Sequence, residues 1–153
     1  PEAGNTGTGS IVDDGDVTEQ KGLIRVQTAK GDGYLDGSVA EVGAIKIDVE
    51  GAETRVLDGL QRRIRKDRPL LVFEVLHGGA AVMAAFADRL PEDYVMFLLL
   101  HTKRRRYAVA SWKGETGDVV AVPVHDGGAG GVAGEAEIRH VTSVLEAPGW
   151  AVG

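Results

Sequence analysis

Cysteine is missing from this chain of 153 residues, and its absence excludes disulfides and thiolate metal sites. Aromatic residues make up 5% of the chain, so aliphatic side chains must supply most of any core. No apolar run reaches the roughly 18 residues that a membrane-spanning helix needs, and no signal-peptide pattern opens the sequence. The net charge of -6 argues against attraction to nucleic acid or to an anionic membrane. These absences favour a cytoplasmic protein with small-molecule partners.

The hydrophobic content of 43% is ordinary for a globular chain, and the length suits one packed domain. We expect this domain to occupy residues 1–125. Residues 126–134 are rich in glycine and predict a flexible linker. Residues 135–153 carry apolar side chains at helical spacing and predict a C-terminal helical tail.

The chain is organised around residues 44–53. Three of residues 44–49 are β-branched, and this run predicts a buried strand that breaks at Gly51. A helix is expected from Ala52 to the basic residues before Pro69, because its apolar positions form one stripe. Residues 70–76 predict a second buried strand. The order of strand, helix and strand predicts a parallel pair with a right-handed crossover.

The same patterns predict further elements along the chain. In order, these are a strand at 23–28, a turn at 30–33, a short helix within 34–42, a helix within 82–90, and strands at 94–100, 106–112 and 119–122.

Acidic residues gather where the two central strands end. Asp48, Glu50 and Glu53 follow the first strand, and Glu74 and His77 lie at the end of the second. Ligands of open α/β sheets bind outside the carboxyl ends of the strands, so these side chains are expected to share one rim. Repulsion among them would raise some carboxyl pKa values. The alternative from spacing alone is a solvated cluster of residues in the first turn of a helix.

Three segments, in this order and spacing, resemble the FkbM family of S-adenosylmethionine-dependent methyltransferases: Ile45–Glu53, Val56–Gly59 and Arg68–Glu74. Weaker similarity extends the resemblance to residues 4–124. It implies an α/β fold with a Rossmann-like class I methyltransferase sheet. The chain would supply the second half of this sheet, with parallel strands, crossover helices and a closing antiparallel strand. The strand with the glycine-rich cofactor loop would precede residue 1, and the exposed sheet edge would favour self-association.

The resemblance also implies a function: methyl transfer from S-adenosylmethionine to a hydroxyl of a small metabolite or sugar. Asp48, Glu50 and Glu74 are then the catalytic candidates, while Glu53 and His77 are expected to bind substrate. No cofactor-binding residue is assigned. No metal is assigned either, although the three catalytic candidates offer the oxygen ligands that magnesium or calcium prefers.

Two alternatives of other kinds stay open. One is a non-catalytic Rossmann-like interaction module that has lost cofactor binding. The other is a nucleotide-sugar transferase in which Asp48 and Glu50 form a metal-binding acidic pair.

Overall fold

The computed structural model describes residues 26–101 and 107–124. The predicted linker and the C-terminal tail lie outside these residues, as does the start of the strand predicted at 23–28. Residues 26–28, which complete that predicted strand, form no regular structure. Within the described ranges, no helix has the length and apolar character needed to cross a membrane.

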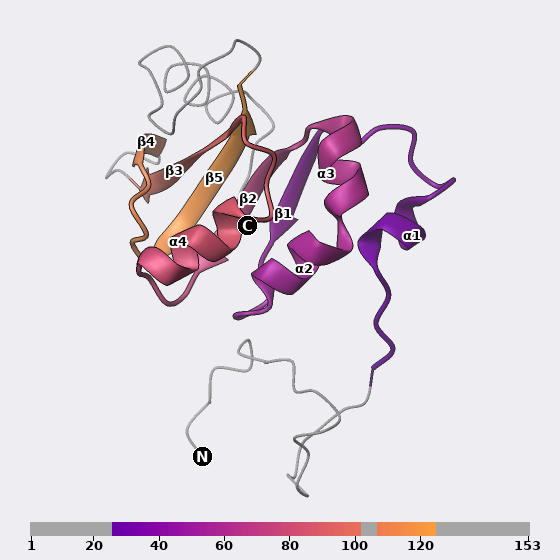
Figure 1. Ribbon diagram of the computed structural model, residues 1–153, viewed down its shortest axis with the longest axis horizontal. Helices are drawn as coiled ribbons and strands as arrows, with labels where there is room; N and C mark the ends of the chain where they lie inside the picture. The colour runs from indigo at the N-terminus through magenta and orange to yellow at the C-terminus, as the bar shows by residue number, and fades with distance from the viewer. Residues whose placement is uncertain (1–25, 102–106, 125–153) are drawn as a thin grey trace, which may run out of the picture.

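The described residues form a mixed α/β fold, drawn in Figure 1. Its elements are α1 (Gly31–Leu35), β1 (Ala44–Ile47), α2 (Glu53–Gly59), α3 (Gln61–Asp67), β2 (Leu70–Val75), α4 (Ala80–Ala87), β3 (Tyr94–His101), β4 (Tyr107–Ser111) and β5 (Gly117–Pro123). Three local expectations were wrong. The single helix predicted after Ala52 is two helices, because the backbone of Leu60 is not helical. A helix begins at Gly31, where a turn was predicted, and it ends at Leu35, so residues 36–42 do not form the short helix expected within 34–42.

The five strands form one sheet in the order β1-β2-β5-β3-β4. The pair β1 and β2 is parallel, with α2 and α3 in the connection between them, as predicted. The other three pairs are antiparallel, so the sheet contains one parallel pair and not a parallel array. β5, the last of the described strands, inserts between β2 and β3 and closes the sheet.

Burial corrects the expectation for the first central strand. β1 ends at Ile47, and this residue is buried, whereas Ala44 and Lys46 are exposed. Among the described residues β1 pairs with β2 alone, so it is an edge strand of this sheet. An edge position explains why a run of β-branched residues is not fully buried.

The two faces of the sheet carry separate apolar clusters. Phe73 and Val75 belong to the cluster that packs against α2, α3 and α4, which lie on one face in Figure 1. Phe73 stacks on Phe86 of α4 with ring centroids 4.4 Å apart. Val72 belongs to the cluster on the other face, because neighbouring residues of a strand point to opposite sides. The two clusters fix β2 in the sheet and thereby place its carboxyl end.

Candidate functional site

Asp48, Glu50 and Glu74 meet at the carboxyl ends of β1 and β2. Ile47 and Phe73 are register partners and both point into the core beneath the helices. Glu74, the next residue of β2, therefore points to the opposite face of the sheet, and Asp48 follows directly after the end of β1. One carboxylate oxygen from each of Asp48, Glu50 and Glu74 lies within 4.8 Å of the others. We call these three residues the acidic trio.

A left-handed turn brings Glu50 into this group. Glu50 has φ of +51° and Gly51 has φ of +99°. A left-handed backbone costs little for glycine but is strained for glutamate. The carboxylate of Glu53 supports the turn, because it accepts a hydrogen bond from the backbone N–H of Gly51 at 3.0 Å. The strained backbone therefore lies at Glu50, whose carboxylate is close to those of Asp48 and Glu74.

Electrostatic repulsion within the site acts on Glu74. Burial raises the pKa of its carboxyl, and the negative charges of Asp48, Glu50, Asp118 and Glu53 raise this pKa further. The side chain of Glu74 is half-buried. Among the described residues, no lysine or arginine forms an ion pair with Glu50 or Glu74.

Two further groups border the trio. Lys46 forms an ion pair with Asp48 at 3.3 Å, but both side chains are about half exposed, so solvent screens this pair. Asp118 is the register partner of Glu74 across β2 and β5. Sequence reasoning missed Asp118 as a site residue. The sequence feature that could have identified it is a carboxylate near the start of an otherwise apolar strand.

The chemistry open to the acidic trio follows from its charge. Three neighbouring carboxylates can hold a hard cation such as magnesium through oxygen atoms. They can also face a positively charged organic group. A carboxyl whose pKa is raised can accept a proton from a reacting group at neutral pH better than an ordinary one.

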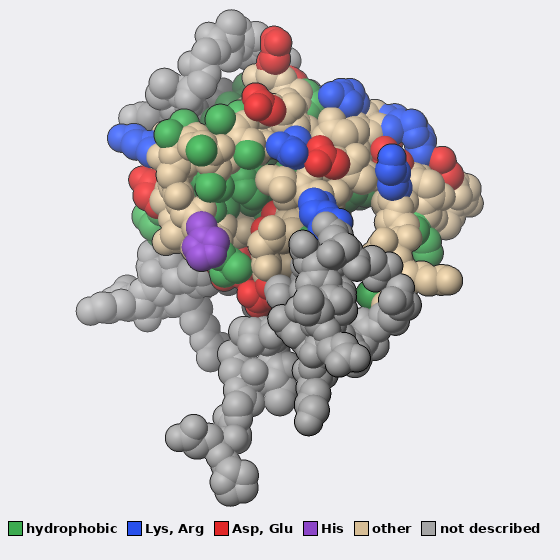
Figure 2. Space-filling view, turned by 60° about the horizontal axis from the view of Figure 1, so that its bottom comes forward, with side chains coloured by type: hydrophobic (Ala, Val, Ile, Leu, Met, Phe, Trp, Pro, Cys, Tyr) green, Lys and Arg blue, Asp and Glu red, His purple; other side chains and the backbone are tan. Residues whose placement is uncertain are grey.

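Glu53 and His77 do not join the trio but line a cavity of about 340 Å³ on the helix-covered face, between the start of α2 and α4. The described residues that line it are Gly51, Glu53, Thr54, Val75, Leu76, His77, Ala81, Val82, Ala85 and Phe86. Glu53 is buried and His77 is exposed. In Figure 2 apolar side chains gather toward the side where α4 lies in Figure 1, with a histidine at their border. The five predicted residues therefore form two groups at the same end of the strands.

Three glycines fix the loop that carries His77. The backbone N–H of Gly79 donates a 2.7 Å hydrogen bond to the carbonyl of Gly114, in the connection between β4 and β5. A Cβ atom at Gly78 would lie 2.4 Å from the same carbonyl oxygen, so no larger residue fits without a backbone shift. Gly79 and Gly114 both have positive φ. This glycine contact holds the rim of the cavity against the rest of the sheet.

A separate cluster of charged residues holds the segment that precedes β1. Both carboxylate oxygens of Asp32 accept backbone N–H groups at the start of α3, from Arg62 at 2.8 Å and from Arg63 at 2.9 Å. Leu60, the residue directly before α3, has no polar side-chain atom that could cap this helix. Asp32 therefore supplies from α1 the cap that α3 lacks.

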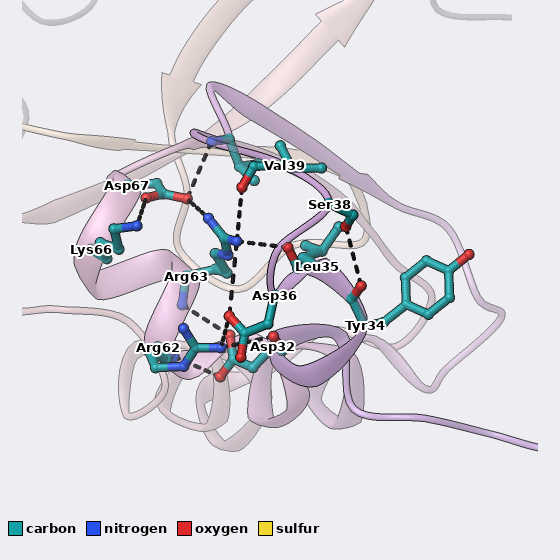
Figure 3. Close-up of polar contacts among 11 residues, drawn as sticks. Asp32, Tyr34, Leu35, Asp36, Ser38, Val39, Arg62, Arg63, Lys66 and Asp67 are labelled. Atoms are coloured by element: carbon teal, nitrogen blue, oxygen red, sulfur yellow. Dashed lines mark hydrogen bonds and ion pairs between the residues drawn. The ribbon is translucent and has the colours of Figure 1, made fainter.

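Arg63 forms the centre of this cluster, as Figure 3 shows. Its side chain is 3% exposed and donates to the backbone carbonyls of Leu35 and Val39 at 2.7 and 3.0 Å. It also donates to Asp67 at 3.0 Å, and Asp67 accepts the backbone N–H of Val42. We call Asp32, Arg63 and Asp67 the clasp. Sequence reasoning placed Arg63 among the basic residues at the helix end and missed this role.

Comparison with known proteins gives one positive result. A family model described as a methyltransferase FkbM domain matches residues 4–109. No curated protein and no solved structure matches the chain.

Proposed function

Given that the chain belongs to the FkbM methyltransferase family, whose model covers 106 of its 153 residues, we propose that it methylates a hydroxyl of a small molecule with S-adenosylmethionine. The family carries the assignment as a methyltransferase. The observation that supports the finer proposal is the acidic trio, in which three carboxylates lie within 4.8 Å of one another at the carboxyl ends of β1 and β2.

The charge of the trio fits this cofactor. When bound, S-adenosylmethionine supplies an activated methyl group on a positively charged sulfur. Carboxylates that repel one another, and of which Glu50 and Glu74 have no described cationic partner, are stabilised by a positive charge brought next to them. In the proposal, Asp48 and Glu50 border both the cationic centre and the methyl acceptor.

Glu74 is proposed as the general base. Its raised pKa follows from burial and from the surrounding carboxylates, so it binds a proton more readily than an ordinary glutamate. In the reaction, a carboxylate oxygen of Glu74 would take the proton of the acceptor hydroxyl as the hydroxyl oxygen bonds to the methyl group. The bond between the methyl group and sulfur would break, and S-adenosylhomocysteine would be the leaving group. Glu53 and His77 are proposed to bind the acceptor from the neighbouring cavity.

We further propose that the described sheet is the acceptor-side half of a Rossmann-like class I sheet. The parallel pair β1 and β2, and the antiparallel insertion of β5, support this assignment. The outer side of β1 has no strand partner among the described residues, which leaves backbone groups for another strand to pair with. The strand and loop that hold the adenosine would then lie outside residues 26–124.

The test measures transfer of a labelled methyl group from S-adenosylmethionine to a panel of hydroxylated small molecules. The protein is produced with any residues that its gene encodes upstream of Pro1. Asp48→Asn and Glu50→Gln are expected to abolish transfer while the circular dichroism spectrum stays unchanged. Glu92→Gln, at an exposed carboxylate in the connection before β3, is the matched control and should keep the activity.

Full turnover in both acid variants would contradict the proposed site. Calorimetry with S-adenosylhomocysteine on the same protein tests cofactor binding separately. If the extended protein released no heat, the non-catalytic interaction module would be the better account.

A further inference from the structure

The cavity beside α4 exists because small side chains face α2. Ala81 and Ala85 lie one helical turn apart on α4, and both line the cavity. The neighbouring Phe86 is buried, where it stacks on Phe73 and meets the edge of Trp112 at 5.9 Å between ring centroids. A larger residue at Ala81 or Ala85 would fill the space that these alanines leave.

The walls of the cavity are mainly apolar. Val75, Leu76, Val82 and Phe86 supply side chains without hydrogen-bonding atoms. A polyhydroxylated molecule against these walls would leave its hydroxyl groups without partners, which costs free energy for each group. A ring or chain of carbon atoms would lose no hydrogen bonds there, and the transfer of its apolar surface out of water would be favourable. The volume of about 340 Å³ is within the range of small-molecule sites.

Glu53 is the acidic residue in the described lining of the cavity. The buried carboxylate of Glu53 lines it, and its charge is among those that act on Glu74 of the acidic trio. The remaining polar side chains of the lining are those of Thr54 and His77. Among the residues that the structure describes, no lysine or arginine lines this cavity, so the described lining offers no permanent positive charge to an anionic ligand.

We propose that this cavity binds the apolar ring or chain of a methyl acceptor that carries no negative charge. Polyhydroxylated sugars and carboxylated molecules are thereby excluded. The proposal rests on the proposed function, since it names the substrate class of the same site. The acceptor hydroxyl lies at the edge of the molecule that faces the carboxyl ends of β1 and β2.

The test uses three probes that share one six-membered carbon ring: cyclohexanol, myo-inositol and cyclohexanecarboxylate. Binding is followed by NMR through the methyl signals of Val75, Leu76 and Val82. Cyclohexanol should shift these signals saturably, whereas myo-inositol and cyclohexanecarboxylate should bind at least about tenfold more weakly. Equal binding of myo-inositol or cyclohexanecarboxylate would overturn the proposal.

Two matched variants on α4 locate the binding. Ala85→Leu fills the cavity and should weaken cyclohexanol binding at least about tenfold. Ala84→Leu, on an exposed position outside the lining, should leave it within about twofold. If Ala85→Leu does not fold, the exposed Ala81 allows Ala81→Leu with the same expected loss. Unchanged binding in a folded cavity variant would refute the site.

These measurements need no methyl donor. Failure of methyl transfer with normal cyclohexanol binding would therefore count against the proposed function alone. Loss of the probe preference with normal methyl transfer would count against this inference alone.

Discussion

The clasp and the acidic trio are two charged clusters of the same small domain that follow opposite rules. In the clasp, Asp67 faces the guanidinium of Arg63, and both side chains are almost fully buried. In the trio, carboxylates face one another, and Glu50 and Glu74 have no described basic partner. In the clasp, the charges of Arg63 and Asp67 neutralise each other within the protein. In the trio, a bound cation or a positively charged ligand would neutralise the carboxylates.

The pKa values of Asp67 and Glu74 shift in opposite directions, in line with this difference. Burial disfavours the charged form of Asp67, but the hydrogen bonds from Arg63 and from the N–H of Val42 outweigh it and lower the pKa. Burial also disfavours the charged form of Glu74, and there the neighbouring acids act in the same direction and raise the pKa. Burial disfavours the charged form in both cases, and the pKa shifts have opposite signs because the partners differ in charge. We infer that the clasp serves folding and that the trio serves chemistry.

The largest effect is expected from Glu74→Gln on catalysis. The amide cannot accept the hydroxyl proton, so kcat for methyl transfer should fall by about 10²- to 10⁴-fold. The measurement is steady-state transfer of labelled methyl with the upstream-extended protein. Glu92→Gln serves as control. A fall smaller than threefold in Glu74→Gln would remove Glu74 from the proposed role.

Breaking the clasp should cost stability. Arg63→Met leaves the buried Asp67 without its cationic partner and removes the bonds to two carbonyls. The free energy of unfolding, measured in urea, should fall by about 3 kcal/mol or more. Arg65→Met, at an exposed position of the same helix, should change it by less than about 0.5 kcal/mol. Equal effects of the two variants would mean that the clasp is not structural.

A smaller loss is expected when α3 loses its cap. Asp32→Ala removes the acceptor of two backbone N–H groups, and the unfolding free energy should fall by about 1 kcal/mol. Asp88→Ala, at the exposed residue after α4, is the control. If Asp32→Ala matched this control, capping by Asp32 would contribute nothing.

The smallest expected effect is on how the free energy of unfolding changes with pH. Because the pKa of Glu74 is raised on folding, its contribution is fully present below the ordinary value of 4.5 and is lost as pH rises through the folded pKa. Glu74→Gln removes this loss. Urea unfolding should therefore show the variant gaining stability relative to the wild type between pH 4 and pH 8. A difference that does not vary with pH would contradict the assignment.

The parts that the sequence predicted well are those that depend on local pattern. The apolar runs at 70–76 and 94–100 became β2 and β3, because several consecutive apolar residues favour a buried strand at almost any place in a sheet. The carboxylates of Asp48, Glu50 and Glu74 were expected together, and the structure brings them within 4.8 Å. That expectation rested on the predicted parallel pair, because the carboxyl ends of parallel strands meet at one edge of a sheet.

The parts that it did not predict depend on pairing. The register of β1 with β2 pairs Ile47 with Phe73, and this pairing brings Asp48 and Glu74, the residues that follow them, close together. The insertion of β5 beside β2 decides that Asp118 faces Glu74. No pattern within one segment contains either fact. The role of Arg63 was missed for a similar reason. The sequence indicates a basic residue at a helix end, but it does not show that the guanidinium donates to Asp67 and to the carbonyls of residues 35 and 39.

The most direct measurement is an NMR titration of the side-chain carboxyl carbon of Glu74. Our account predicts a midpoint above 4.5 in the wild type, and a lower midpoint when Asp48→Asn and Glu50→Gln are combined, because two negative charges next to it are removed. Glu92 provides the exposed reference carboxyl in the same experiment. A midpoint for Glu74 at or below 4.5 that the two substitutions leave unchanged would contradict the account.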